Sequence, residues 1–454
     1  MMEKDSAILK EFTNPLIRSV QEQYAISPEH YRGDIKLGLR NSDGTGVLAG
    51  VSKVGSVQGY LMQDGQRVPA EGRLYYRGIE LTDIVEAHRK AGTFGFEEVA
   101  YLLLMGYLPS KGELAYFDKI MNQARKLPEG FTEGMIMRHP SHNIMNELAR
   151  SVLSLYSYDP DPDNNSLENM LLQSVKLIGY FPAIVANAYA MQRHYFNGDS
   201  LHIHFPEPEL STAENFLRMI RPDKSYTEEE AHLLDMMLMV HAEHGGGNNS
   251  TFVCRALTSA GTDAYSAYSG AIGALKGFRH GGANIKVVQM FDTIKQGVRD
   301  WKDDEEISHF LGEIMDKKQG DGSGLIYGMG HAVYTLSDPR ATILRDSAEK
   351  LAGEKGMLDE FELLKNVERL APGVMAEKKG GSKIICANVD LYSGMVYRML
   401  GIPTELFTPL FAVARMSGWC AHRIEEFMTC SRIMRPAYKA VVKEKDYLPI
   451  QNRG

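Results

Sequence analysis

The sequence predicts a mostly α-helical protein with one short β-hairpin in its N-terminal part. Apolar residues recur at helical spacing over 96–104 and 117–124, with a Leu108-Pro109-Ser110 break between the two stretches. Alternation typical of strands occurs in one place, over 60–76 around Asp64-Gly65, which suits a hairpin. A chain of 454 residues exceeds what one hydrophobic core usually fills, so we expect a large domain and a smaller one.

Two further signals place helix boundaries. Thr227 and Glu230 have the spacing of a capping box, and the apolar run 233–240 follows directly, so we predict a helix that starts after Thr227. The run Asp159-Pro160-Asp161-Pro162-Asp163 predicts a loop between two helical stretches.

Composition excludes several classes of protein. Lys+Arg 50 against Asp+Glu 58 gives a net charge of −8, so we expect no nucleic-acid partner. No uninterrupted apolar run reaches the roughly 18 to 20 residues of a membrane span, and charges near the start of the chain speak against a secretory signal. The four cysteines are widely separated, which favours reduced, mostly buried thiols in a cytoplasmic protein.

Two zones rich in glycine are candidates for chemistry. The zone 241–284 is dense in Gly, Ala, Ser and His, and most of its small residues suit close helix packing. The zone 320–340 is Gly-rich and ends in His, Asp and Arg, which predicts backbone that turns tightly or approaches a ligand. Gly328-Met329-Gly330 lacks the third glycine of a dinucleotide fingerprint, and no βαβ pattern surrounds it.

The first zone holds two histidine motifs. His241-x-Glu243-His244 could share a helix face, but it is not an H-E-x-x-H zinc motif, so we favour helix-end hydrogen bonding or anion binding and predict no metal. His280 precedes two glycines and a helical run at 285–293, so its imidazole lies near a helix start, where the neutral form is favoured. Such a His can donate to a carbonyl oxygen that becomes an enolate, although a structural turn explains the spacing equally well.

The C-terminal third adds a carboxylate and two arginines. Asp390 lies in an otherwise apolar segment, where a general base with a tuned pKa and an N-cap for the next helix are both open. Arg415 and Arg435 occur in the stretch 411–438, where a guanidinium group can hold a carboxylate through paired hydrogen bonds.

Taken in order, these segments resemble the citrate synthase family. The resemblance covers most of the chain and rests on an ordered set of blocks, each of them weak alone: Gly38-Leu39-Arg40, 72–78, 96–104, 140–148, 241–255, 275–284, the blocks around Asp390 and Arg415, and 432–436. It implies a nearly all-α fold in which a small domain, here 283–392, closes over the active site of a large domain formed by 1–282 and 393–454. It also implies a homodimer or higher homo-oligomer.

The resemblance implies three reacting side chains. Asp390 matches the family's general base, which takes a proton from the methyl group of acetyl-CoA. His280 matches the residue that stabilises the resulting enol at the thioester oxygen, and His331 matches the one that polarises and protonates the ketone of oxaloacetate. A carboxylate is a weak base for a carbon acid, so help at the thioester oxygen is physically required. No metal or redox cofactor is expected.

The resemblance also implies the residues that bind substrate. His244, Arg340 and Arg415 match the binders of the oxaloacetate and citrate carboxylates, and Phe411 matches an aromatic residue beside the reacting centre. Arg435 matches an arginine that arrives from the neighbouring subunit.

The CoA end departs from the family's pattern. Backbone of the loop 325–330 is expected to bind CoA, with Leu325, Ile326, Gly328 and Gly330 as the contacts. Thr335 stands where relatives carry a basic residue for the CoA phosphates, with Ala332 before it, and Tyr327 stands where some have Pro. Lys378, Lys379 and Lys383 could replace the missing phosphate contacts, or be solvated loop residues.

Three functions therefore remain in competition. Citrate synthase is preferred, 2-methylcitrate synthase with propionyl-CoA as donor is the alternative, and a catalytically inactive regulatory relative is the third. One methylene is worth only about 1 to 3 kcal/mol in an apolar pocket, so the sequence does not separate the first two. A serine hydrolase is disfavoured because no G-x-S-x-G motif occurs.

Overall fold

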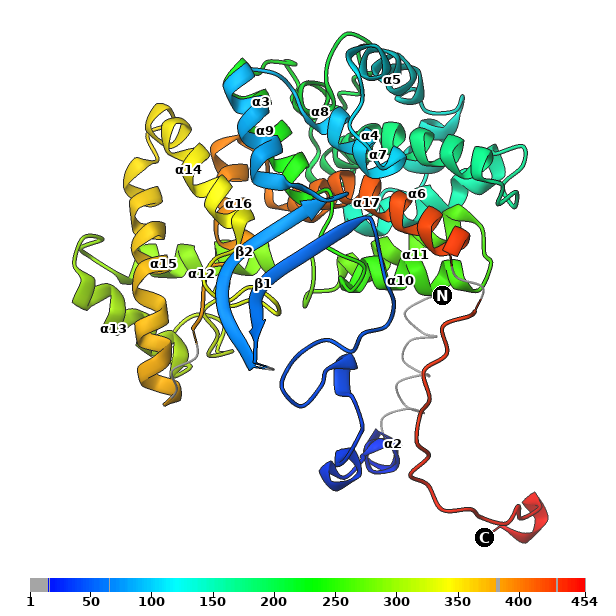
Figure 1. The fold of residues 1–454 in the computed structure, drawn as a ribbon, viewed down its shortest axis with the longest axis vertical. Coiled ribbons are helices and arrows are strands. Elements are labelled where there is room, and N and C mark those ends of the chain that lie inside the picture. Colours follow the sequence, from blue (N-terminus) through cyan, green and yellow to red (C-terminus); the bar gives the residue numbers. More distant parts are fainter. Residues whose placement is uncertain (1–14, 16, 65, 381–383, 430–431, 454) are drawn as a thin grey trace. The chain divides into compact units, whose positions relative to one another are not determined.

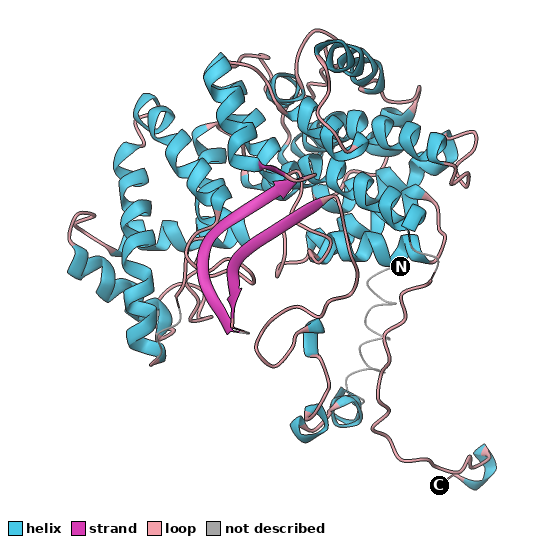
Figure 2. Cartoon of the chain, in the orientation of Figure 1, coloured by secondary structure: helices cyan, strands magenta, loops and turns pink. Residues whose placement is uncertain are grey.

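A computed structural model of the chain describes residues 15, 17–64, 66–380, 384–429 and 432–453. The chain divides into two compact units, one formed by residues 50–434 and the other by the terminal residues 1–49 and 435–454. Figure 2 shows that the strands of the described residues form one small sheet and that helices make up most of the rest. The prediction of a mostly α fold is therefore confirmed.

The described part of the terminal unit, residues 15, 17–49 and 435–453, contains short elements. These are α2 Ile17–Tyr24 and the 3-10 turns Pro28–Tyr31, Leu37–Leu39 and Ile450–Asn452. None of these elements has a buried residue. The sequence analysis did not separate this unit from the rest.

The sheet of residues 50–434 has three antiparallel strands in the order β1-β2-β3. They are β1 Gly55–Gln63, β2 Gln66–Tyr76 and β3 Ile79–Glu80, and β1 and β2 form the long curved pair drawn in blue in Figure 1. The predicted hairpin is confirmed, and it begins at Gly55, five residues before the alternating pattern does. The short β3 was not predicted, since two residues carry no periodicity.

The helices account for most of the remaining core. Those of residues 50–434 are α3 Leu81–Ala91, α4 Phe96–Met105, α5 Lys111–Ala124, α6 Ile144–Leu155, α7 Leu167–Asn197, α8 Thr212–Ile220, α9 Glu228–His241, α10 Asn249–Ser259, α11 Ala264–Lys276, α12 Ala283–Gly297, α13 Asp304–Met315, α14 Pro339–Glu354, α15 Leu358–Lys379, α16 Val389–Met399 and α17 Phe407–Thr429. A π-helical turn spans Thr132–Met137, and 3-10 turns span Tyr156–Tyr158 and Thr404–Leu406.

Local sequence signals explain where several helices begin. The Thr227 hydroxyl accepts from the backbone N–H of Glu230 and the Glu230 carboxylate accepts from that of Thr227, so the predicted capping box is confirmed at the start of α9. Ser110 and Glu113 make the same reciprocal pair at the start of α5. These caps satisfy N–H groups that a helix start leaves without partners.

Two long helices lie in the core of this unit. α17, drawn in orange to red in Figure 1, is buried at almost every position from Phe407 to Ile424 and packs against α4, α7, α9 and α10. Among the described residues, α7 alone is long and apolar enough to cross a membrane, and 72% of that stretch is buried inside the protein. Burial of this kind is typical of a core helix, as the packing of α7 against α5, α6 and α17 shows.

Two other predictions concern the same unit. Cys254, Cys386 and Cys420 are free, buried thiols, as predicted, and Cys430 lies outside the described residues. The predicted boundaries of a small domain at 283–392 lie within the unit of residues 50–434. That division into a large and a small domain stays a prediction.

Candidate active site

Residues from five segments of the chain surround one site. His244 follows α9, His280 lies in the turn between α11 and α12, and His331 lies in the loop before α14. Asp390 is in the first turn of α16, and Arg415 is in the buried middle of α17.

Hydrogen bonds from the backbone after His331 fix the tautomer of its ring. The N–H groups of Val333 and Tyr334 donate to Nδ1 of His331 at 3.0 and 3.1 Å. A nitrogen that accepts from the backbone holds a lone pair, so the proton of the neutral ring is on Nε2. The ring stacks on Tyr334 with centroids 4.5 Å apart and meets the His244 ring edge-on at 5.2 Å. His331 is thereby oriented to donate from Nε2.

His280 is held as a neutral imidazole. Its Nε2 lies 3.1 Å from the Ser250 hydroxyl, and the Ser250 backbone N–H is directed at the same nitrogen at 3.4 Å. With the lone pair on Nε2, the neutral ring carries its proton on Nδ1. Burial lowers the pKa of His280 to about 4, and the nearby charge of Arg415 acts in the same direction. At neutral pH His280 is therefore a hydrogen-bond donor without charge.

Asp390 does not cap α16. The N-cap is Asn388, whose side-chain oxygen accepts from the backbone N–H of Asp390 at 3.0 Å, so the capping alternative for Asp390 is wrong. Burial raises the pKa of the Asp390 carboxyl to about 6, against the opposing charge of Arg340. Asn388 also donates to the carbonyl of Gly330 at 2.8 Å, which ties the start of α16 to the residue before His331.

Arg340 is paired inside the protein. Its Nε and Nη2 donate to the two carboxylate oxygens of Asp338 at 3.0 and 2.7 Å. The same carboxylate accepts from the backbone N–H of Val389 at 3.2 Å, beside Asp390. The Arg340 guanidinium carbon lies 5.7 Å from the centre of the Tyr334 ring. Asp338 thus fixes the plane of this guanidinium next to the candidate base.

Arg415 is buried without a counter-ion in hydrogen-bond contact. Its Nε donates to the carbonyl of His241 at 2.7 Å, and its guanidinium carbon lies 4.7 Å from the centre of the Phe411 ring. Among the described residues, Nη1 and Nη2 find no hydrogen-bond partner. Burial lowers the pKa of Arg415 to about 10, and a buried, incompletely paired guanidinium is costly unless an anion completes it.

Two histidines beside Arg415 also have buried nitrogens without a hydrogen-bond partner among the described residues. Nε2 of His244 and both ring nitrogens of His241 lack a partner among the described residues. Burial and the charges of Arg340 and Arg415 hold the pKa of His244 well below its usual range, and the same is true of His241. Donors of this kind around an unpaired arginine form a site that fits a carboxylate.

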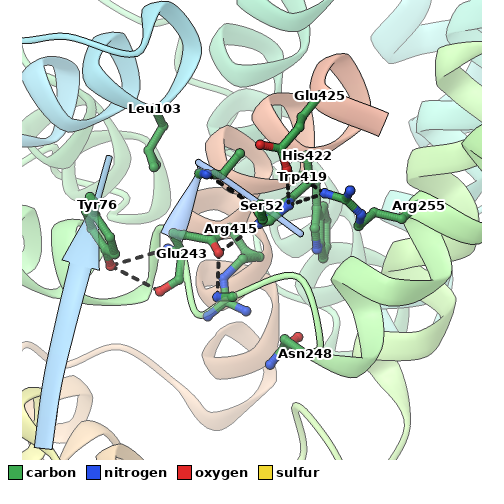
Figure 3. A network of polar contacts seen from close by, with 12 residues as sticks. Ser52, Tyr76, Leu103, Glu243, Asn248, Arg255, Arg415, Trp419, His422 and Glu425 are labelled. Carbon is green, nitrogen blue, oxygen red and sulfur yellow. Dashed lines mark hydrogen bonds and ion pairs between the residues drawn. The ribbon is translucent and has the colours of Figure 1, made fainter. Parts of the chain in front are cut away.

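A buried polar network, which the sequence analysis did not foresee, lies behind Arg415 (Figure 3). Arg255 donates to Nδ1 of His422 at 2.9 Å, so the neutral ring carries its proton on Nε2 and donates to Glu243 at 2.8 Å. Burial alone would raise the pKa of Glu243, but His422 and the charge of Arg415 hold it below its usual range. The Tyr76 hydroxyl donates to backbone carbonyls in the same place, among them that of Glu243 at 3.2 Å.

This network fixes the backbone from which His244 projects. Glu243 and His422 are 179 residues apart in the chain, and no local pattern connects them. The one sequence signal was the pair of ionisable residues at 243 and 244, directly after the apolar run 233–240. Glu243 is occupied by His422 and by the N–H of Gly245, at 2.5 Å.

The predicted CoA loop differs from the site around Arg415. Ile326 is buried, whereas Leu325 is 49% exposed. Two backbone groups are already used, because Asn388 donates to the carbonyl of Gly328 at 2.8 Å and Gly330 donates to Cys386 at 2.7 Å. Gly328 has φ +82°, and a Cβ there would lie 2.9 Å from the Leu391 side chain, so glycine is required.

A small cluster of polar side chains flanks this loop. The Tyr327 hydroxyl donates to Asp321 at 2.7 Å, and Lys286 pairs with the same carboxylate at 3.1 Å. Both line a cavity of about 240 Å³ together with Leu325. Lys378, proposed for the CoA phosphates, pairs with Asp316 at 2.8 Å instead. Lys383 lies outside the described residues, and so does the side chain of Lys379.

Comparison with known proteins decides the family. The sequence matches the family profile described as citrate synthase, C-terminal domain, over residues 43–437. The chain belongs to the citrate synthase family. The citrate synthase of Deinococcus radiodurans is 36% identical over 386 residues, which cover 85% of this chain and 94% of that protein.

Other relatives of the family bear on the donor and on the fold. The 2-methylcitrate synthase of Shewanella oneidensis is 31% identical over 84% of this chain and 92% of its own length. The citrate synthase of Thermoplasma acidophilum, solved as a ternary complex with carboxymethyl coenzyme A and oxaloacetate, superposes with a TM-score of 0.75 at 28% identity. The superposition covers 93% of this chain and all of that one.

One residue expected at the family's site belongs to the other unit. Arg435 is exposed and belongs to the unit of residues 1–49 and 435–454, whereas every other predicted site residue belongs to residues 50–434. Its arrival from a neighbouring subunit stays a prediction.

Proposed function

We propose that this chain is a citrate synthase, which condenses acetyl-CoA with oxaloacetate and hydrolyses the citryl-CoA thioester to citrate and CoA. The observation that carries the proposal is Arg415. Its two terminal nitrogens are buried and have no hydrogen-bond partner in the described part of the chain, beside two neutral histidines and a carboxyl whose pKa is raised to about 6. A site with this composition fits a dicarboxylate ketone next to a weak carbon acid.

The first step is removal of a proton from the acyl donor. The Asp390 carboxylate takes a proton from the methyl carbon of acetyl-CoA, and the C–H electron pair moves toward the thioester carbonyl. A pKa near 6 makes Asp390 a stronger base than an exposed carboxylate and leaves it ionised at neutral pH. The Nδ1–H of His280 donates to the thioester oxygen, where negative charge develops, and the neutral ring avoids protonating it fully.

The second step forms the carbon–carbon bond. The enol carbon attacks the ketone of oxaloacetate, while Nε2–H of His331 polarises the ketone oxygen and gives it a proton. Backbone donation to Nδ1 of His331 holds the ring in the tautomer that this step needs. Water then cleaves the thioester, which releases CoA and makes the reaction irreversible.

The carboxylates of oxaloacetate are held by cationic and neutral donors. Arg415 supplies two terminal NH₂ groups that have no partner among the described residues, His244 supplies Nε2, and Arg340 supplies positive charge at a position set by Asp338. Phe411 packs against the Arg415 guanidinium beside the reacting centre. The proposed chemistry requires no metal or redox cofactor, because each proton and charge is handled by these side chains.

The identity of the acyl donor is the open alternative within this chemistry. Relatives at about 31 to 36% identity carry both names, citrate synthase and 2-methylcitrate synthase. Steady-state kcat/KM for acetyl-CoA and propionyl-CoA, each with saturating oxaloacetate, tests the choice. We expect acetyl-CoA to be preferred, and a clear preference for propionyl-CoA would make the chain a 2-methylcitrate synthase. No release of CoA from either donor would favour the inactive regulatory relative.

The assembly and its motions complete the proposal. We expect a homodimer or higher homo-oligomer in the cytoplasm, closure of residues 283–392 over the substrates, and backbone binding of CoA by 325–330. Arg435 of a neighbouring chain would then reach the oxaloacetate carboxylates. Mixing an Arg435→Ala variant with an Asp390→Ala variant tests this, because shared sites restore part of the activity and separate sites do not.

A further inference from the structure

The β1–β2 ladder is interrupted at one place near its middle. Gln58 pairs with Arg73 and the next pair is Tyr60 with Pro69, so three residues of β2 oppose a single residue of β1. A bulge of this kind leaves backbone N–H and C=O groups without partners in the ladder. These groups lie within the hairpin and must be satisfied from outside it.

Thr335, four residues after His331, reaches into this bulge. Its Oγ1 accepts from the N–H of Ala70 at 3.2 Å. The same hydroxyl lies within donating distance of the Ala70 carbonyl, at 3.1 Å, and of the Gly59 carbonyl. One hydroxyl therefore joins both strands of the hairpin to the segment that carries His331.

Ser337 makes a second connection two residues later. Its Oγ accepts from the N–H of Gly72 at 3.1 Å and donates to the carboxylate of Glu71. Both hydroxyls, two residues apart in the chain, therefore bond backbone N–H groups of β2. The segment 335–337 thus pairs with the bulge through its side chains.

Two glycines allow this close approach. A Cβ at Gly59 would lie 2.5 Å from the Cα of Tyr334, and one at Gly72 would lie 2.2 Å from the carbonyl oxygen of Ser337. Both distances are too short for any side chain, because the obstructing atoms belong to backbone. The hairpin and the segment after His331 are therefore in direct backbone contact.

We propose that the β1–β2 hairpin is a positioning element for the condensation, in which Thr335 and Ser337 hold the segment between His331 and Arg340 in its reactive arrangement. This inference rests on the proposed function. Thr335 then has a different task from a CoA phosphate contact, since its hydroxyl is occupied by Gly59 and Ala70.

Tyr334 carries the effect of the hairpin to the reacting groups. It is 3% exposed, and its ring is stacked on His331 at 4.5 Å, with the Arg340 guanidinium carbon 5.7 Å away. A shift of Tyr334 would move the backbone N–H that sets the tautomer of His331. Displacement of a catalytic group by about 1 Å can cost on the order of 100-fold in rate.

Thr335→Val and Thr335→Ser form a matched pair that tests the proposal. Valine keeps the shape but loses the hydroxyl, so we expect kcat to fall roughly tenfold, with the KM for acetyl-CoA changed by less than about twofold. Serine keeps the hydroxyl and should retain most of kcat. Thr429→Val is the control, because the hydroxyl of this exposed residue donates to the carbonyl of Glu425 in its own helix, at 2.6 Å.

Amide hydrogen exchange tests the docking without any assay of activity. In Thr335→Val, peptides that cover residues 66–76 should exchange at least about tenfold faster than in the wild type, and in Thr335→Ser they should not. Ser337→Ala should accelerate the same peptides through the N–H of Gly72. These readouts apply even if a variant loses activity by partial unfolding.

The outcomes separate this inference from the proposed function. A Thr335→Val protein with unchanged kcat and unchanged exchange overturns the inference, and so does one in which only the KM for acetyl-CoA rises. If the wild type releases no CoA, both the proposed function and the catalytic role of the hairpin are contradicted. A wild type that releases CoA, together with slow kcat and fast exchange in the valine variant, supports both.

Discussion

The two ends of the site are built in different ways. Around Arg415, side chains are buried and several of their polar atoms have no partner among the described residues. These hydrogen-bond donors are available to a ligand. Around the loop 325–330, the polar side chains Tyr327, Asp321 and Lys286 satisfy one another, and backbone groups are the remaining contacts. The unpaired donors around Arg415 favour binding of an anion. The loop 325–330, whose polar side chains already bond one another, is expected to bind its ligand mainly by shape complementarity.

The largest expected effect tests the base that lies between the two ends. Asp390→Ala should lower kcat by at least about 100-fold, because it removes the buried carboxylate, with a pKa raised to about 6, that takes the methyl proton. Initial rates of CoA release with both substrates saturating measure this. Asp390→Asn preserves the shape and should be as slow. Near-normal turnover in either variant would remove Asp390 from the mechanism.

The next effect compares Arg415 with Arg340. Arg415→Ala should weaken oxaloacetate binding by about 1.5 to 3 kcal/mol, roughly 10- to 150-fold, and leave the KM for acetyl-CoA nearly unchanged. Arg369→Ala is the matched control, since Arg369 forms an exposed ion pair with Asp304. An effect on acetyl-CoA alone would reverse the assignment of the two ends.

Arg340→Ala should weaken oxaloacetate binding in the same way, and it should also lower the stability of the protein. It leaves Asp338 buried without its counter-ion, so the free energy of unfolding should fall by about 3 to 5 kcal/mol. Arg415 has no carboxylate in contact, so its removal should cost less stability. Denaturant unfolding of both variants measures the difference, and equal losses would mean that the pairing with Asp338 contributes little.

The pH dependence of kcat/KM tests the raised pKa of Asp390. The carboxylate is the active form and its pKa is raised to about 6, so kcat/KM should be constant above pH 7 and fall as the pH drops through 6. At pH 5 the activity should be about a tenth of its plateau. His280 stays neutral over this range because its pKa is lowered to about 4. An acid limb near pH 4 would contradict the raised pKa of Asp390.

The smallest effect is expected at the CoA end. Tyr327→Phe removes one hydrogen bond to Asp321, so the KM for acetyl-CoA should rise about two- to fivefold, with kcat and the KM for oxaloacetate unchanged. Tyr195→Phe is a suitable control, because Tyr195 is exposed near the end of α7. A larger effect on oxaloacetate would show that the two ends are coupled.

Much of the fold could be predicted because its signals are local. The capping box at Thr227 and the alternation in the hairpin each involve residues close in sequence, and the structure has both. Sequence periodicity does not predict contacts between distant segments. Examples are the pairing of Glu243 with His422 and the hydrogen bond of Thr335 to Gly59. The capping alternative for Asp390 failed for a local reason, since Asn388 two residues earlier takes that place.

The most direct test of the central claim is the fate of the acetyl carbons. Acetyl-CoA labelled with ¹³C at both acetyl carbons is mixed with oxaloacetate and the purified protein, and the product is read by NMR. The account predicts labelled citrate, with the methylene carbon bonded to the former ketone carbon, and one free CoA for each citrate. Labelled acetate, or acetyl-CoA that remains intact, would contradict it.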